Sequence, residues 1–534
     1  MGPYLRKIRF YHIFWVFFYF FLFCLLWHGA LSYLDPDLGW HLQVGKEIAR
    51  TGAVPSLNHY NYTFTGSWVD HEWLSNFLLY FSYSHFGYLA TAAGFALLII
   101  AVLILLNIWV RRVWPAASPG IIAFFQIIGV IASLPHFGVR IQEVGLLFLL
   151  GLLIIIADYN KKRRWRVLLF LPPLMYLWAC LHASFLIGFF LLGAWVAVKL
   201  VEKILVRFWP KPWWDFSTVL NFREIAIFTG VAVLSLTVTL FTPYKLSLYS
   251  FLSGYQDSFY KLHIQEWLSQ FSFPFHYSQL IYLAFAVLGV GLYIYHALGR
   301  EKYFKIDLWT LFLAVLFIGL SFESRRHFPL MFVATFILLV AVYSVIFRLP
   351  AIDGGKWRLM SWLKIYLLVC LLLAAVYQLT QTKFITDPFQ SFCADYPCGA
   401  VKFLESRPSY NQLNIFNDYG WGGYLIWTLP ERQLFIDGRL PQVEFAGHTF
   451  LAEYLEFFKP GGQIIKKINQ YDVKLILIPA KDQEVKAARW EKFIFGIKDE
   501  ELKVHNYLRD YLLSAPDWQP VYYDQTAIIY VKKD

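Results

Sequence analysis

Eleven runs of apolar residues, each about as long as a membrane-crossing helix, occupy most of the first 380 residues of this 534-residue chain. A helix needs about 20 predominantly apolar residues to cross the hydrocarbon core of a bilayer. The composition agrees, because only 16% of the residues are charged, against about 25% in soluble domains. We therefore predict a polytopic α-helical membrane protein with about eleven transmembrane helices, at roughly 13–33, 88–108, 119–135, 142–157, 167–181, 183–201, 225–241, 279–297, 307–321, 329–347 and 365–380.

The lysines and arginines between these runs separate into two sets. Alternate short loops are basic, for example 161–166, and the loops between them hold few Lys or Arg. Because basic loops stay in the cytoplasm, we predict a multi-pass protein of the cell membrane with a cytoplasmic N-terminus. The net charge of +11 is explained by this topology, so no nucleic-acid partner is predicted.

The composition changes to a mixed α/β pattern near residue 380. We predict a transmembrane module at 1–380, with outer loops at 34–87 and 242–277, and an extracytoplasmic α/β domain at 381–534. Connections longer than about 12–15 residues are usually functional or disordered, and the aromatic content of the first outer loop favours function. Strands are predicted in the C-terminal domain at 413–416, 433–436, 473–478 and 527–531.

Two of the five cysteines lie in the predicted outer domain. Cys393 and Cys398 are five residues apart, whereas the other three lie in apolar runs. Because an oxidising compartment outside the membrane permits disulfides, this pair is a candidate disulfide.

Two carboxylates, Asp35 and Asp37, follow the first apolar run, which ends near Leu34. Charge beside hydrocarbon costs a few kcal/mol unless it is paired or hydrated, so such residues are candidates for function. A carboxylate there could act as a general base that takes a proton from an acceptor hydroxyl. The alternative is that the aspartates cap a helix at 38–48.

The same loop contains a second polar group, Asp70-His71-Glu72. These side chains could position a substrate. Carboxylates with an imidazole would also suit a divalent cation such as Mg²⁺ or Mn²⁺, which makes a metal a candidate cofactor. The alternative is a solvated turn before a helix.

Arg325, Arg326 and His327 lie in a predicted outer loop, against the charge rule. An arginine presents a planar fork that matches phosphate oxygens, so we predict phosphate or pyrophosphate binding, with Arg140 contributing from another loop. The alternative is that the arginines reach lipid headgroups. Glu266, in the second outer loop, is either a substrate contact or an interfacial anchor.

A glycine-rich segment at 417–424 follows a predicted strand and contains Asp418 and Tyr419. Glycine allows positive φ and close backbone approach. The segment is therefore either a tight turn or a rim that closes over the acceptor. The segment 435–439 has the same two interpretations.

The pattern Asp-Pro-Asp-Leu-Gly-Trp-His-Leu at 35–42, followed by Trp-Val-Asp-His-Glu-Trp-Leu at 68–74, resembles the first outer loop of GT-C superfamily glycosyltransferases. Arg-Arg-His at 325–327, the glycine-rich segment at 417–424 and Phe-Ile-Asp-Gly-Arg at 435–439 also look like bacterial members of that group. The resemblance covers nearly the whole chain.

The resemblance implies a catalytic mechanism. In GT-C enzymes an acidic residue of the first outer loop is the base, the donor is a polyprenyl-phosphate sugar, and transfer inverts the anomeric carbon. Carried over, Asp37 is the first choice for the base and Asp35 the second. Asp418-Tyr419-Gly420 is similar to the Trp-Trp-Asp-Tyr-Gly signature of the oligosaccharyltransferase catalytic subunit, but Phe416-Asn417 replaces the Trp pair, so N-glycosylation of proteins is not predicted.

The predicted function is therefore a hexosyl- or pentosyltransferase that transfers a sugar to an extracytoplasmic glycan, lipid or protein. The alternative is a lipid-linked saccharide transporter or a non-catalytic envelope-assembly protein. A transporter is expected to show broken helices near the membrane midplane, whereas the polar residues here gather at one predicted surface.

Overall fold

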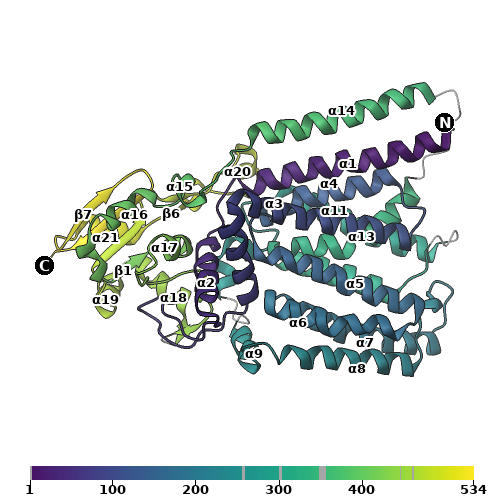
Figure 1. Cartoon of the computed structure of the whole chain (residues 1–534), viewed down its shortest axis with the longest axis horizontal. Coiled ribbons are helices and arrows are strands. Elements are labelled where there is room, and N and C mark those ends of the chain that lie inside the picture. The colour runs from purple at the N-terminus through teal and green to yellow at the C-terminus, as the bar shows by residue number, and fades with distance from the viewer. Residues whose placement is uncertain are drawn as a thin grey trace.

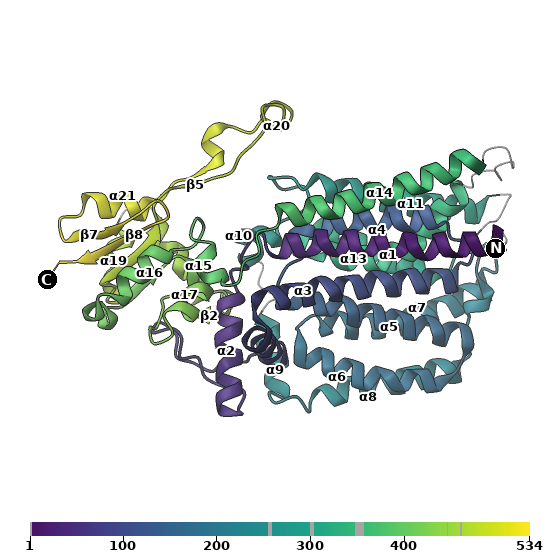
Figure 2. The same ribbon diagram turned by 45° about the horizontal axis from the view of Figure 1, so that its top comes forward.

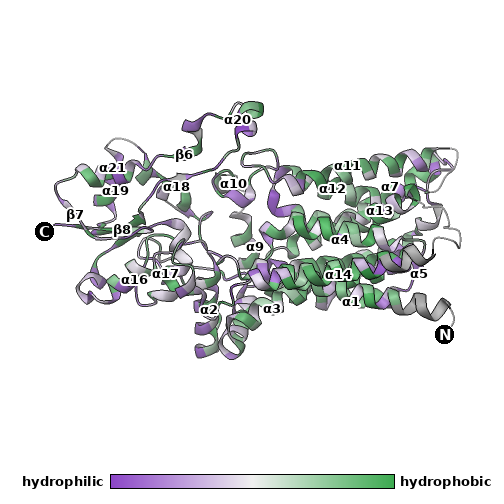
Figure 3. Cartoon of the chain, turned by 90° about the horizontal axis from the view of Figure 1, so that it is seen from above, coloured by the Kyte–Doolittle hydropathy of each residue, from purple (hydrophilic) through white to green (hydrophobic). Residues whose placement is uncertain are grey.

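The computed structural model describes residues 3–254, 259–299, 304–347, 357–445, 447–459 and 462–533. A bundle of long helices forms one end of the molecule, and a mixed α/β region forms the other (Figure 1). The N-terminus lies at the end of the bundle farthest from the α/β region. Hydrophobic residues dominate the bundle helices (Figure 3).

Within the described residues, nine helices are long and apolar enough to cross a membrane, and two shorter apolar helices accompany them. All of them coincide with predicted spans, which confirms a polytopic helical membrane protein. The long helices are α1 (Pro3–Ala30), α3 (Trp73–Val113), α4 (Pro119–Ser133), α5 (Val144–Lys162), α7 (Phe185–Phe208), α8 (Phe222–Thr239), α11 (Tyr277–Leu298), α13 (Phe328–Ile346) and α14 (Trp357–Gln381), and the shorter ones are α6 (Leu171–Leu181), preceded by a 3₁₀ helix, and α12 (Leu308–Glu323).

Two helices of the loop predicted at 34–87 lie across the end of the bundle (Figure 2). One is α2 (Leu38–Thr51), which ends at Gly52 in the left-handed conformation that favours glycine. The other is the first part of α3, because Gly87 has a φ of 76° and breaks that helix. The chain can thus turn from the membrane surface into the membrane at Gly87.

The loop after α8 contains short helices, α9 (Leu246–Ser253), α10 (Phe259–His263) and the 3₁₀ turn η6 (Gln265–Trp267). Residues 255–258 of the predicted loop 242–277 lie outside the described residues. The 3₁₀ turn η7 (Arg325–His327) contacts this loop, because the backbone N–H of Arg325 donates to the carbonyl of Leu268 at 3.1 Å.

A four-stranded sheet with the order β1-β4-β8-β7 organises the C-terminal region. β1 (Ile415–Asn417) and β4 (Leu475–Pro479) are parallel, and β4, β8 (Ala527–Lys532) and β7 (Trp518–Tyr523) are antiparallel. Short strands pair as β2 (Glu444–Phe445) with β3 (His448–Thr449), and as β5 (Gln483–Glu484) with β6 (Lys503–Val504). The helices around them are α15 (Pro388–Ser391), α16 (Cys398–Glu405), α17 (Gly422–Thr428), α18 (Phe450–Leu455), α19 (Gln463–Gln470), α20 (Arg489–Phe495) and α21 (Tyr507–Ser514).

The strand predicted at 433–436 is wrong. Leu434 forms only an isolated bridge with Asn61. The backbone N–H of Phe435 donates to the side-chain oxygen of Asn417 at 3.0 Å, so the segment finds its partners in a loop and a side chain. Strand β7 has no counterpart among the predicted strands.

The structure has a disulfide between Cys393 and Cys398.

The loop between α1 and α3 and the C-terminal region share one hydrophobic core. It includes Leu38 and Leu42 of α2 together with Leu425 of α17 and Leu434. The backbones also touch, since a Cβ at Gly423 would lie 2.2 Å from the carbonyl oxygen of Pro36. This contact holds the loop that contains Asp35 and Asp37 against the C-terminal region.

Candidate active site

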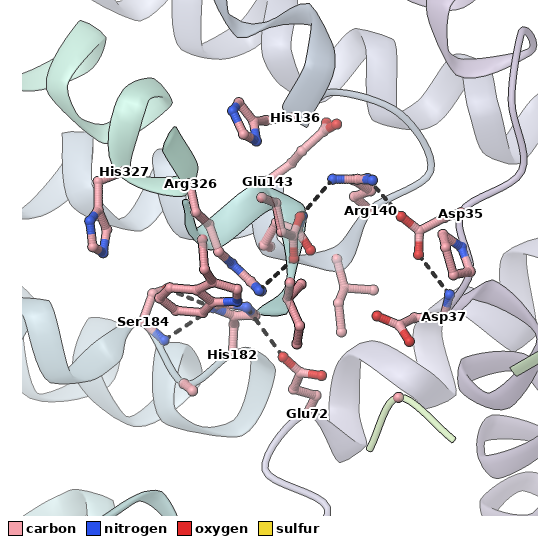
Figure 4. Close-up of a pocket in the computed structure, with 18 of the residues that line it drawn as sticks. Asp35, Asp37, Glu72, His136, Arg140, Glu143, His182, Ser184, Arg326 and His327 are labelled. Carbon is pink, nitrogen blue, oxygen red and sulfur yellow. Dashed lines mark hydrogen bonds and ion pairs between the residues drawn. The ribbon is translucent and has the colours of Figure 1, made fainter. Parts of the chain in front are cut away.

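A cavity of about 860 Å³ lies where the loops 34–87 and 242–277 meet the C-terminal region. Its walls bring together most of the residues singled out in the sequence, from segments far apart in the chain (Figure 4). Of the predicted site residues it is lined by Asp35, Asp37, Asp70, His71, Glu72, Arg140, Glu266, Arg325, Arg326, His327 and Tyr419.

A chain of ion pairs crosses the cavity wall (Figure 4). Asp35 Oδ2 lies 2.6 Å from Arg140 Nε. Glu266 accepts from Arg140 Nη1 at 3.2 Å and from Arg326 Nη1 at 2.8 Å. Glu266 thus sits between two guanidinium groups, and these cations keep the pKa of its carboxyl below the usual range although burial opposes this. Two arginines converging on one carboxylate form a site for an anion.

Asp37 is not part of this chain. Within the described residues no cation lies within ion-pair distance of its carboxylate; its Oδ1 accepts from Trp40 Nε1 at 2.9 Å. Burial, with Asp35 nearby, raises the pKa of Asp37 to about 7. A carboxylate with a pKa near neutrality is suited to general-base catalysis.

Gly438, in the C-terminal region, lies directly against the carboxylate of Asp37. A Cβ at Gly438 would lie 2.2 Å from Asp37 Oδ1, so only glycine fits beside the carboxylate. Next to it, Arg439 is buried and pairs with Asp437 at 2.7 Å. The predicted 435–439 segment therefore contacts the candidate base directly.

Glu72 faces the same cavity from another side. Its Oε1 lies 3.2 Å from His182 Nε2 and 3.5 Å from His71 Nε2. Burial opposes ionisation, but His71 above all keeps the pKa of Glu72 well below the usual range. Burial lowers the pKa of His182 to about 4. Glu72 is therefore an anion that faces the cavity.

Asp70 has a supporting position. Both of its oxygens accept from Asn76 Nδ2 at 2.9 Å, and the Oδ1 of Asn76 is 2.6 Å from His41 Nδ1. Burial raises the pKa of Asp70 to about 6. Asp70, Asn76 and His41 thus join α2 to the start of α3.

Arg325 and Arg326 are adjacent but make different contacts. Arg325 is buried, and its guanidinium donates to the backbone carbonyls of Ser269, at 3.2 Å, and Ser272. Arg326 instead reaches Glu266 and stacks on Trp267, 4.7 Å from its ring centre. His327 Nδ1 lies 3.1 Å from the carbonyl of Leu320. The predicted phosphate contacts of Arg325 and His327 stay predictions.

Asp418 caps the 3₁₀ turn η10 (Tyr419–Trp421), because its Oδ1 accepts from the backbone N–H of Gly420 at 2.9 Å. It is not among the residues that line the cavity, whereas Tyr419 is. Burial raises the pKa of Asp418 to about 6. The contacts of Asp418 are those of a turn, the alternative left open by the sequence.

Glu143 and Asn76, which were not predicted from the sequence, support the site. Glu143 is buried in the cavity wall, and its Oε1 accepts from the backbone N–H of Gly138 at 2.6 Å. Asn76 holds Asp70. Glu143 and Asn76 both stand among mostly apolar residues, so only the charge or the amide in that neighbourhood could have indicated them.

The described residues contain no group of three or more His, Cys, Asp or Glu side chains arranged to hold a metal ion. The predicted metal ligands at 70–72 diverge, since Asp70 bonds Asn76 whereas Glu72 bonds histidines. These donors do not fit a divalent-cation site, and the mechanism proposed below contains no metal step.

The pairing of Arg140 with Asp35 leads to a prediction on stability. Arg140→Ala leaves a largely buried carboxylate without its cation, which costs about 3–5 kcal/mol. Adding Asp35→Asn removes that charge and is expected to restore part of the loss, measured by thermal unfolding in detergent. As a control, Lys162→Ala removes an exposed pair with Asp158, worth about 1 kcal/mol or less. A double variant less stable than Arg140→Ala alone contradicts the pairing.

No protein-family model and no curated protein sequence matches the chain. Solved structures do match. The archaeal oligosaccharyltransferase AglB from Archaeoglobus fulgidus, in complex with an inhibitory peptide and a dolichol-phosphate, superposes with a TM-score of 0.54 at 10% identity, over 89% of this chain and 70% of that chain.

A second structure, the Archaeoglobus fulgidus oligosaccharyltransferase tethered with an acceptor peptide, gives a TM-score of 0.51 at 10% identity, over 94% of this chain and 72% of that chain. ArnT from Cupriavidus metallidurans, bound to undecaprenyl phosphate, gives 0.45 at 12% identity, over 99% and 98%. The oligosaccharyltransferase matches show that this chain has the GT-C fold, as its sequence motifs predict.

Proposed function

We propose that the chain is a membrane glycosyltransferase that moves a sugar from a polyprenyl-phosphate carrier to an extracytoplasmic acceptor. The observation that carries the proposal is that Asp37, a carboxylate without a cation partner among the described residues, lines one cavity with Arg140 and Arg326. The oligosaccharyltransferase of similar fold is described with a dolichol-phosphate, a lipid of the carrier class proposed here.

Residues that line this cavity can carry out each step of the transfer reaction. Asp37 takes the proton of an acceptor hydroxyl while that oxygen attacks the anomeric carbon. The bond between the anomeric carbon and the phosphate oxygen breaks, and its electron pair leaves with the polyprenyl phosphate. Arg326 and Arg140 stabilise the charge on the leaving phosphate, and such preorganised electrostatics is usually the largest catalytic contribution. Attack opposite to the leaving group inverts the anomeric carbon.

Glu72 and Glu266 complete the proposed site. Glu72, ionised and facing the cavity, accepts hydrogen bonds from hydroxyl groups of the transferred sugar. Glu266 bridges the arginines in the structure. Its carboxylate must move away from them, at least in part, when the donor phosphate binds. Asp35 keeps Arg140 in position through their ion pair.

The orientation in the membrane belongs to the same proposal. The cavity lies at the end of the bundle opposite the N-terminus (Figure 1). With a cytoplasmic N-terminus, as the basic loops predict, the cavity and residues 381–534 face outward. The acceptor is then a glycan, lipid or protein outside the membrane.

The test is release of free polyprenyl phosphate by the purified protein. Polyprenyl-phosphate hexoses and pentoses are supplied with short glycan, lipid or peptide acceptors, with and without chelator, and Asp37→Asn is run in parallel. Release and acceptor modification that disappear in the variant support the proposal. Tight lipid binding without release from any donor favours the transporter or assembly alternative.

The pKa of Asp37 predicts the pH profile. A general base works only when deprotonated, and the pKa of Asp37 is about 7. We therefore expect kcat/KM to rise with pH and to level off above about 7. The pKa of His182 is about 4, so this histidine stays neutral across the rise. A profile that is flat from about pH 5 to about pH 9 would remove Asp37 as the base.

A further inference from the structure

An arm at residues 483–504 projects from the C-terminal sheet region. Its stalk is the two-stranded ribbon of β5 and β6, in which Glu484 pairs with Lys503, and its tip is α20. Figure 2 shows that the arm leaves the sheet region and brings α20 to the level of the end of the bundle. The arm lies outside the cavity and provides none of its lining residues.

The tip contacts the helix bundle where a transmembrane helix begins. Tyr277, the first residue of α11, donates its hydroxyl to Glu491, and its ring lies 5.4 Å from that of Trp490. The ring of Phe275 lies 4.5 Å from that of Phe495. Because α11 is long and apolar enough to cross a membrane, these contacts place α20 beside the point where the chain enters the bilayer.

The remaining apolar side chains of the tip are uncovered. Phe493 is 89% exposed and Ile494 is 62% exposed. Both lie in the apolar second half of α20, whose first half carries charged residues, so that Figure 3 shows the helix partly green and partly purple. Large apolar side chains that are exposed next to each other indicate a surface that is covered by lipid or by another molecule. Aromatic residues concentrate where a bilayer meets water. The contact with Tyr277, at the start of α11, places the tip at this level.

We propose that the arm docks on the lipid bilayer, with Phe493 and Ile494 inserted among the lipids beside the start of α11. The insertion depends on apolar burial and not on lipid charge, because the arm carries as many basic as acidic residues: Lys486, Arg489, Lys492, Lys498 and Lys503 against Glu484, Glu491, Asp499, Glu500 and Glu501. The arm thus tethers the C-terminal region to the membrane at a point separate from the bundle.

The test places a fluorescent label at the tip of the full chain in phosphatidylcholine nanodiscs. Phe493→Cys carries an environment-sensitive dye, in a background with Cys370→Ser because that thiol is only half-buried. Lipids with a nitroxide on the acyl chain are expected to quench this dye. The matched control is Leu513→Cys, equally apolar and 70% exposed on α21, in the sheet region away from the bundle (Figure 2).

Quenching at 493 that exceeds quenching at 513, and that is unchanged when phosphatidylglycerol is added, supports the proposal. Equal quenching at the two positions overturns it. Quenching at 493 that appears only with phosphatidylglycerol also overturns it, because binding would then depend on charge.

A second measurement needs no label. Trypsin cuts after Arg489, Lys492 and Lys498, and an arm held in lipid is protected at these bonds. Phe493→Ser with Ile494→Ser is expected to be cut on the order of tenfold faster in nanodiscs, because cleavage tracks the population of the released arm. Equal cleavage of the two proteins contradicts docking through these side chains, whatever the protein's sugar-transfer activity.

Discussion

Asp37→Asn is expected to lower turnover by about 10² to 10⁴-fold, the range that a positioned general base contributes. The amide cannot accept the acceptor's proton at neutral pH. Its oxygen can still accept the hydrogen bond that Trp40 donates to Oδ1 at 2.9 Å, so the local geometry persists. The measurement is single-turnover release of polyprenyl phosphate at saturating donor and acceptor.

The same variant is expected to be at least as stable as the natural protein above neutral pH. The pKa of Asp37 is raised in the folded protein, to about 7 from 3.8. For a raised carboxyl pKa, folding stability is lost as pH rises from the unfolded value through the folded one. Asn carries no charge and so removes that loss. If Asp37→Asn unfolds at a higher temperature than the natural protein but has lost turnover, the role of Asp37 is catalytic and not structural.

The control is Asp472→Asn, which changes an exposed aspartate in the C-terminal region. It is expected to leave turnover and stability nearly unchanged. Full turnover in Asp37→Asn removes this residue from the mechanism and makes Asp35 the next candidate.

Arg326→Ala is expected to lower kcat by about 10² to 10³-fold, as the loss of one preorganised donor does in other active sites. The arginine lies in the cavity with only Glu266 as its ion-pair partner among the described residues. If it stabilises the leaving phosphate, its loss slows bond cleavage more than it weakens donor binding. Lys at this position recovers only part of the rate, because it lacks the planar fork.

Glu266→Gln distinguishes this role from a structural one. If Arg326 serves only to hold Glu266, both variants lose activity alike. If Glu266 occupies the place of the donor phosphate, Glu266→Gln lowers the KM for the donor while Arg326→Ala lowers kcat. Arg50→Ala, an exposed arginine in the last turn of α2, is the control. Equal losses in Arg326→Ala and Glu266→Gln contradict the phosphate role.

Part of the site could be read from the sequence because the physical signal is local. A carboxylate beside hydrocarbon, as at Asp35 and Asp37, is costly wherever it occurs. An arginine in a loop predicted to lie outside, against the charge rule, as at Arg326, is equally conspicuous. These signals marked residues that the structure places around one cavity.

Other features depend on contacts between distant segments. Arg325 and Arg326 look alike in the sequence, but a 3₁₀ turn directs one to the carbonyls of Ser269 and Ser272 and the other to Glu266. Glu143 stands in an apolar run and gives no pattern. The segment 433–436 has strand composition, yet its partners are Asn61 and the side chain of Asn417.

The sequence by itself determined where the long apolar helices lie, because the cost of burying polar groups in lipid acts on each segment separately. It also determined the GT-C class of fold through its motifs. Only the tertiary structure decided which carboxylate has no cation partner among the described residues and which arginine pairs with Glu266. It also decided that Gly438 and Gly423 bring the C-terminal region against Asp37 and Pro36. Such choices depend on packing and ion pairing between segments hundreds of residues apart, which no local pattern encodes.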